Sequence, residues 1–275
     1  MAACTTAGID YDRSTYKITP SLPSTDLTTP LATGLIQDLV VGVLVEEAGV
    51  ERVELPLGSW VLASPGLSTA DKVFILIQGS GGVRAGQWSR SLCRNETLKE
   101  GSILPHVMEA SRQGYSLLIL NPNHNTDEDG EPIPGSESQI EHTQTVMDLA
   151  LVQDAHPLRI DDHAHVVMMV HSFGGRCVQS LLSHPQLGPL VSSRVSRLAL
   201  TDSRYSPQQD RDALAWLGGD HVRHWVASDL PLDTPILPER GFMGTPCVSA
   251  GTVDHASTNH VSLSSILSFL FPDIS

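Results

Sequence analysis

The stretch VVMMVHSFGGRCVQSLL, residues 166–182, decides the fold of this chain. Its first five residues are apolar without alternation, which is typical of a strand buried on both faces of a parallel sheet. Glycines follow within a few residues, and helical spacing of apolar residues then begins. The stretch therefore predicts a strand, a sharp turn at Ser172 and a helix that starts at Gly174.

The predicted turn resembles the nucleophile elbow of α/β-hydrolases, G-x-S-x-G. Small residues flank that serine because its backbone is strained and the next helix approaches the strand closely. Gly174 and Gly175 fit this pattern, whereas Val170 stands at the first glycine position. At the helix N-terminus, the amide of Phe173 would help to bind an oxyanion. The alternative is a turn of the same shape whose serine has no catalytic role.

A nucleophilic serine needs a base, and the base needs an orienting acid. Asp202 follows the apolar segment 198–200, and His255 follows the segment 247–250. Both positions are at the carboxyl ends of predicted strands, where open α/β sheets place their sites. We therefore predict a triad of Ser172, His255 and Asp202. Asp254 or Asp233 as the acid and His260 as the base remain alternatives.

A glycine-rich loop, residues 78–82, follows the first predicted strand of the sheet. Hydrolases place their second oxyanion donor in such a loop, where glycines let backbone N–H groups approach a ligand. Gly79, Ser80 and Gly81 are the candidates. The loop lacks both the G-x-G-x-x-G and the G-x-x-x-x-G-K-[ST] patterns, so we do not expect a nucleotide cofactor.

We also expect no metal. The segment DDHAH, residues 161–165, and the pair His221 and His224 contain possible ligands, but neither group has an obvious third ligand from a separate element. The prediction is therefore an active site without a metal and without a cofactor.

Short apolar segments alternate with helical patterns along the chain. This alternation predicts an α/β fold of three layers, with a doubly wound, mostly parallel sheet of α/β-hydrolase type. The predicted strands are residues 74–77, 117–120, 166–170, 198–200 and 247–250. The clearest helical patterns are at 103–108, 146–150, from 174 onward and 263–270.

The ends of the domain are less regular. Residues 1–33 are rich in Ser, Thr and Pro and predict a mobile arm, so we expect one domain from 34 to 275. Residues 35–49 favour a helix, with a strand as the alternative because of their β-branched run. Residues 123–139 predict a long acidic loop, which we expect to be a solvated excursion rather than a binding lid.

The charge balance excludes some classes of partner. The chain has 17 Lys and Arg against 31 Asp and Glu, a formal charge of −14, which disfavours direct binding to nucleic acids or anionic membranes. No apolar run is long enough to span a membrane, and the opening residues do not read as a secretory signal. Four scattered cysteines favour free thiols and a reducing compartment, the cytoplasm or the nucleus.

Several further motifs are more particular than the serine turn: RAGQW at 84–88, N-x-x-L-x-x-G-S at 95–102, LNPN at 120–123 and VSAGT at 248–252. In these motifs the chain resembles the Argonaute-binding-protein-two family, which includes animal cotranscriptional regulators and a region attached to some fungal class II histone deacetylases. The resemblance implies an α/β-hydrolase-like fold. It also places Ser172, Asp202 and His255 on the serine, aspartate and histidine of the family's motifs.

Two hypotheses follow. The resemblance implies a protein-interaction factor in small-RNA silencing, heterochromatin formation or splicing control, in the nucleus or cytoplasm, with Argonaute-like, chromatin or splicing proteins as partners. The residues of the predicted triad indicate instead a serine hydrolase that acts on a small ester, thioester or amide.

Overall fold

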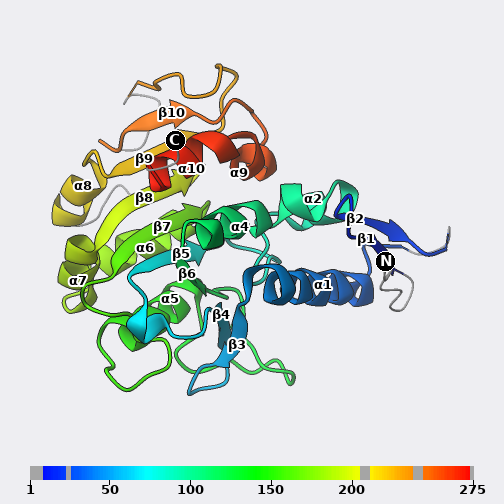
Figure 1. Cartoon of the computed structure of the whole chain (residues 1–275), viewed down its shortest axis with the longest axis horizontal. Helices are drawn as coiled ribbons and strands as arrows, with labels where there is room; N and C mark the ends of the chain where they lie inside the picture. Colours follow the sequence, from blue (N-terminus) through cyan, green and yellow to red (C-terminus); the bar gives the residue numbers. More distant parts are fainter. Residues whose placement is uncertain (1–8, 23–25, 205–210, 238–243, 273–275) are drawn as a thin grey trace.

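The centre of the molecule is one eight-stranded sheet in the order β10-β9-β8-β7-β5-β6-β4-β3 (Figure 1). The structure, a computed structural model, describes residues 9–22, 26–204, 211–237 and 244–272. Neighbouring strands are parallel except around β4, which is antiparallel to β3 and β6. This is the strand order of the α/β-hydrolase fold, so the predicted class is confirmed. The strands are β3 Glu51–Glu54, β4 Trp60–Ala63, β5 Lys72–Ile77, β6 Ser116–Ile119, β7 His165–His171, β8 Val195–Thr201, β9 Val222–Val226 and β10 Cys247–Ser249.

Helices cover both faces of the sheet, which gives the three predicted layers (Figure 1). On one face lie α1 (Pro30–Ala48), α4 (Leu104–Arg112) and α10 (Leu263–Leu270). On the other lie α5 (Gln139–Leu151), α6 (Gly174–Leu182) and α7 (Leu187–Arg194). The remaining helices are α2 Arg90–Asn95, α3 Leu98–Gly101, α8 Arg211–Leu217 and α9 Thr258–Val261, with short 3-10 turns η1 Leu67–Thr69 and η2 His255–Ser257.

The central strand β5 shows why its sequence lacks polar alternation. Phe74 and Leu76 contact the first group of helices, and Ile75 and Ile77 contact the second. All four side chains are fully buried. Successive side chains of a strand point to opposite faces, so a strand covered on both sides must be apolar throughout.

Residues 35–49 belong to a helix, not to a strand, and this helix begins earlier than the expected domain boundary. Thr29 caps α1 by accepting a hydrogen bond from the amide of Ala32, and Pro30 occupies the first turn. Gly49 ends the helix with φ of 64°.

The expectation of a mobile arm over residues 1–33 is wrong for the hairpin that the structure places at 9–20. Strands β1 (Ile9–Asp12) and β2 (Lys17–Pro20) pair as an antiparallel sheet beside α1 (Figure 1). Ile9, Tyr11 and Ile18 are at most 5% exposed and join the hydrophobic core. The hairpin contributes few apolar residues, but they alternate and so bury one face. Residues 1–8 lie outside the described residues, and one domain from 34 to 275 remains a prediction.

All five predicted strands are present, whereas β3, β4 and β9 were not predicted. Arg223 and His224 interrupt the apolar pattern of β9, although His224 is fully buried. The edge strand β3 is largely exposed and reads ERVE, so its sequence carries no core signal.

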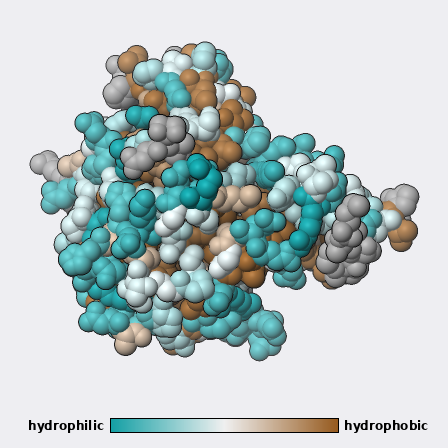
Figure 2. Space-filling view, in the orientation of Figure 1, coloured by the Kyte–Doolittle hydropathy of each residue, from teal (hydrophilic) through white to brown (hydrophobic). Residues whose placement is uncertain are grey.

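The visible surface is mostly hydrophilic, with hydrophobic residues gathered beside α1 (Figure 2). In the described ranges no helix is both long and apolar enough to cross a membrane. Cys93, Cys177 and Cys247 are buried and form no disulfide with one another, and Cys4 lies outside those ranges.

Four buried histidines make the fold sensitive to acid. Burial lowers the pKa of each to about 3, so in the native state they stay neutral, whereas the unfolded chain binds protons below about pH 6.5. Stability should therefore fall as the pH drops below 6.5, by roughly 1 kcal/mol for each histidine and each pH unit. The four are His106, His142, His171 and His224.

The pH dependence of stability is measured as the midpoint temperature of thermal unfolding between pH 7.5 and 4.5. His142→Gln should flatten the profile, because one titrating group is removed. His163→Gln, at an exposed position, should leave it unchanged. A midpoint independent of pH over this range would contradict the account.

Candidate active site

Ser172 occupies a sharp turn between β7 and α6, as the sequence predicts. Its φ is 53°, in the left-handed region that residues other than glycine seldom adopt. The turn is held by backbone hydrogen bonds: the Ser172 amide donates to Thr201 O, and Ser172 O accepts from the amides of Gly175 and Arg204. Ser172 therefore has the position and strained backbone of a nucleophile elbow.

The glycines after Ser172 explain how Val170 fits in this turn. A Cβ on residue 174 would lie 2.9 Å from Ile77 O and 3.1 Å from the Val170 Cβ. A Cβ on residue 175 would lie 2.7 Å from the Ser203 Cβ. Because position 174 has no side chain, α6 approaches β5 and β7 closely even though a valine stands two residues before the serine.

Asp202 and His255 come together at the carboxyl edge of the sheet. The two side chains form a hydrogen bond of 2.5 Å between His255 Nδ1 and Asp202 Oδ2. Asp202 lies just after β8 with φ of 36°, and its Oδ1 also accepts from the Ala227 amide at 3.2 Å. Burial raises the pKa of Asp202, but the hydrogen bonds from His255 and Ala227 outweigh it and lower this pKa. The carboxylate is therefore charged and fixes the ring of His255.

Ser172 and His255 line one cavity of about 310 Å³, together with Trp88, Arg90, His171 and others. No hydrogen bond joins Ser172 Oγ to the His255 ring, both within the described chain. Catalytic hydrogen bonds often form only when a substrate is bound, so this geometry is compatible with a resting triad. The catalytic roles of the three residues remain a prediction.

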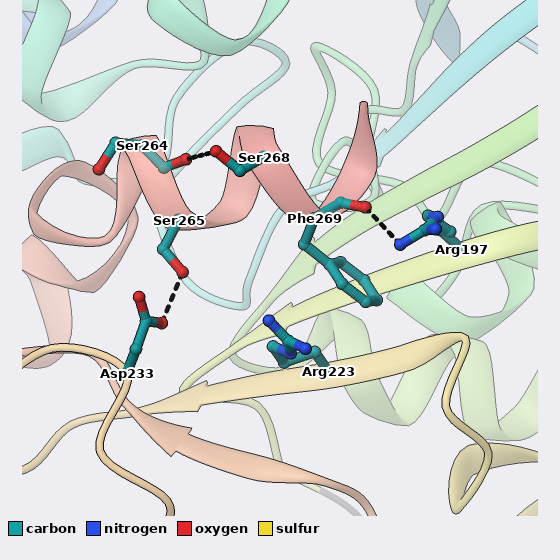
Figure 3. Close-up of a pocket in the computed structure, with 7 residues that line it drawn as sticks. All are labelled: Arg197, Arg223, Asp233, Ser264, Ser265, Ser268 and Phe269. Carbon is teal, nitrogen blue, oxygen red and sulfur yellow. Dashed lines mark hydrogen bonds between the residues drawn. The ribbon is translucent and has the colours of Figure 1, made fainter. Parts of the chain in front are cut away.

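The structure gives the alternative residues other positions. Asp233 Oδ1 accepts from Trp225 Nε1 and from Ser265 Oγ, beside a second cavity that Arg197 and others line (Figure 3). Asp254 caps the turn η2, where its carboxylate accepts from the Ala256 amide and from Ser257 Oγ. It therefore supports the segment that carries His255. The third alternative, His260, is exposed on α9.

Gly79, Ser80 and Phe173 lie where they could contribute to an oxyanion site, whereas Gly81 does not. Gly79 lies against the serine, where an added Cβ would be 2.8 Å from the Ser172 Cβ, and Ser80 also lines the cavity. Phe173 precedes α6, where the first amides of a helix have no partner within the helix. Gly81 is exposed with φ of 101° and is outside the lining of the cavity, so it shapes the turn.

Asn123, the first residue of the acidic loop, holds the segment around Gly79 in place. Asn123 Nδ2 donates to Gly79 O at 2.8 Å and to Val83 O at 3.0 Å. Its Oδ1 accepts from Gln139 Nε2 at 2.6 Å, at the start of α5. The first residue of the loop thus has a structural role, which nothing in the sequence indicates beyond the LNPN motif.

His171 and Trp88 are further site residues that the triad search missed. The His171 ring is 4.6 Å from the ring of His255 and 6.1 Å from that of Trp88, centroid to centroid. Burial, and then the charge of His255, lower the pKa of His171 to about 3. Its Nδ1 lies 3.0 Å from Thr201 O, so this nitrogen donates there. A neutral ring therefore supports one face of His255.

Possible metal ligands are dispersed. Within the described ranges, no three His, Cys, Asp or Glu side chains are grouped so that they could hold a metal ion. His224 is fully buried, with its Nε2 accepting from the Ser203 amide at 2.9 Å.

The close approach at Gly174 is testable. Gly174→Ala should destabilise the protein by about 1–3 kcal/mol, because the new methyl group overlaps Ile77 O and crowds Val170. Gly42→Ala is the matched control: this glycine lies in α1 with nothing within 4 Å, so alanine should stabilise the helix by up to about 1 kcal/mol. Urea unfolding measures both. Equal stability of the two variants would contradict the proposed contact.

Comparison with known proteins adds family relationships to this geometry. Residues 32–131 match the Arb2 domain family. The chain is 27% identical over 290 residues to the cotranscriptional regulator ARB2A homolog of Gallus gallus, covering 86% of this chain and 68% of that protein. Its identity to the cotranscriptional regulator ARB2A of Homo sapiens is 26%, with the same coverage.

Among solved structures, the chain is similar to the histone deacetylase Clr3, with a TM-score of 0.55 and 15% identity. The match covers 92% of this chain and 40% of the Clr3 chain, and it supports the fold alone. Ser172, Asp202 and His255 all lie beyond the residues that match the Arb2 domain. The resemblance inferred from the sequence motifs is nonetheless confirmed: the chain carries a match to the Arb2 domain family and is similar to the ARB2A cotranscriptional regulators.

Proposed function

We propose that this chain is a cotranscriptional regulator that acts through protein partners in the nucleus. The observation that carries this proposal is the similarity to ARB2A regulators over 86% of the chain. The partners that fit are Argonaute-like, chromatin or splicing proteins, in small-RNA silencing, heterochromatin formation or splicing control. The formal charge of −14 favours contact with proteins over direct contact with a nucleic-acid backbone.

Affinity purification of the tagged chain from nuclear extract tests this proposal. After nuclease treatment, an Argonaute, chromatin or splicing protein should still co-purify, because the contact is with protein. The Ser172→Ala variant is purified in parallel. A partner that binds the protein surface should be retained when the serine is lost. Repeated recovery of the folded chain alone would refute the proposal.

We propose as a second function that the Ser172 centre hydrolyses a small ester, thioester or amide. The observation that favours it is specific: Ser172, on a strained turn, shares one cavity with a His255 ring that Asp202 already orients. The chemistry follows from these positions. Ser172 Oγ attacks the carbonyl carbon while His255 Nε2 takes its proton, and the same proton then passes to the leaving group.

The remaining steps use water and backbone amides. The amides of Phe173 and of the Gly79–Ser80 segment would stabilise the negative oxygen of the tetrahedral intermediate. Water then attacks the acyl-enzyme, gives a proton to His255 and releases the acid, which restores the Ser172 hydroxyl.

A fluorophosphonate probe tests the second function, because it phosphonylates only an activated serine. The wild-type chain should be labelled and Ser172→Ala should not. Asp202→Asn should slow labelling by roughly 10⁴-fold, since an amide no longer selects the required form of the His255 ring. His260→Gln, outside the cavity, should react at the wild-type rate. Folded wild-type protein that resists the probe would refute the hydrolase function and leave the regulator untouched.

A further inference from the structure

We propose that the cavity at Ser172 selects an ester whose acyl group carries a carboxylate, and that Arg90 and Arg94 bind this negative charge. The inference names a substrate class and rests on the proposed hydrolase function. Its starting point is that both arginines line the same cavity as Ser172 and His255.

The backbone of α2 fixes the two arginines side by side. They stand four residues apart, so their side chains share one face of the helix. Ser89 caps the helix by accepting from the Leu92 amide, and the buried Cys93 packs against Gly101. The two guanidinium groups are therefore presented to the cavity together.

No carboxylate balances these arginines in the described part of the chain. The ion pairs found there involve other arginines and the His255–Asp202 pair. Asp26 is close enough to feel the charge of Arg94, but its pKa is lowered mainly by hydrogen bonds from the Thr28 hydroxyl and amide to its Oδ1. Within the ranges that the structure describes, no acidic side chain thus forms an ion pair with Arg90 or Arg94.

Arg84 adds to the positive charge of the site, and Gly82 leaves room for the Arg90 side chain. The Arg90 guanidinium lies directly over Gly82, where any side chain would overlap it. Arg84 is half-buried, and its pKa is lowered by burial and then by the charge of Arg90. Two neighbouring arginines that repel each other are stabilised by an anion between or beside them.

In the second cavity, beside Asp233, the arginines have structural roles. There, Arg197 donates to Phe269 O, and both Arg197 and Arg223 stack over the Phe269 ring (Figure 3). Among the residues that the structure describes, Arg90 has no such partner, and Arg94 donates to the exposed Asn95 side chain. A guanidinium binds a carboxylate through two parallel hydrogen bonds, so the pair at Ser172 fits an anionic acyl group.

Two esters of the same length separate charge from size. Mono(4-nitrophenyl) succinate is anionic and 4-nitrophenyl butyrate is neutral, and enzymatic hydrolysis of each gives the acid and 4-nitrophenol. The release without enzyme, which for the succinate ester proceeds by attack of its own carboxylate and loss of 4-nitrophenol, is subtracted. The wild-type chain should prefer the succinate ester in kcat/KM. Each of Arg90→Gln and Arg94→Gln should reduce this preference by about fivefold. The charge-matched controls are the single variants Arg52→Gln and Arg112→Gln, at exposed positions away from the cavity, which should keep the preference.

A binding measurement distinguishes failure of this inference from failure of the hydrolase function. Succinate added to Ser172→Ala at constant ionic strength should change the fluorescence of Trp88, which lines the cavity, and Trp88→Phe identifies that signal. Hydrolysis of both esters without preference would overturn the anionic acyl group and leave the hydrolase. Succinate binding that depends on Arg90 and Arg94, without hydrolysis of either ester, would support the anion site and refute the hydrolase. Absence of both binding and hydrolysis would overturn both.

Discussion

The close approach of α6 to the ends of β5, β7 and β8 is the constraint on which the candidate site depends. It requires no Cβ at residues 174 and 175, and it forces the chain to reverse at Ser172. The same approach brings the Ser172 amide to Thr201 O, one residue before Asp202. Serine and aspartate are thus placed by a single backbone junction, and His255 joins them from the turn after β10.

Buried histidines hold several of the turns around this junction. The Nε2 of His224 accepts from the Ser203 amide, and the Nε2 of His142 accepts from the Asn121 amide. A ring nitrogen can accept only when it carries no proton, so these turns require neutral histidines. Burial supplies that condition by lowering their pKa to about 3. The packing that covers the sheet therefore also fixes the backbone on which Asp202 stands.

The sequence predicted the elements whose hydrophobic pattern agrees with their burial in the folded protein. Strand β7 is apolar because both its faces are covered, and Gly174 follows because the helix must approach closely. The prediction failed where the two diverge: β9 contains buried His224 and a stacked Arg223, and the hairpin at 9–20 buries only a few of its residues. At the site, chain order indicated Ser172, Asp202 and His255. His171, Trp88, Arg90 and Arg94 are defined by spatial proximity alone, which no spacing in the sequence encodes.

The backbone is strained at two residues of the candidate site. Ser172 and Asp202 both have positive φ, and a residue with a Cβ held there costs about 1–3 kcal/mol. Glycine would relieve that cost at either position, as it does at Gly81 and Gly251. A hydroxyl that must face a cavity, and a carboxylate that must fix an imidazole beside it, would require side chains at both positions. The strain therefore favours a chemical role for the cavity that coexists with regulation through partners.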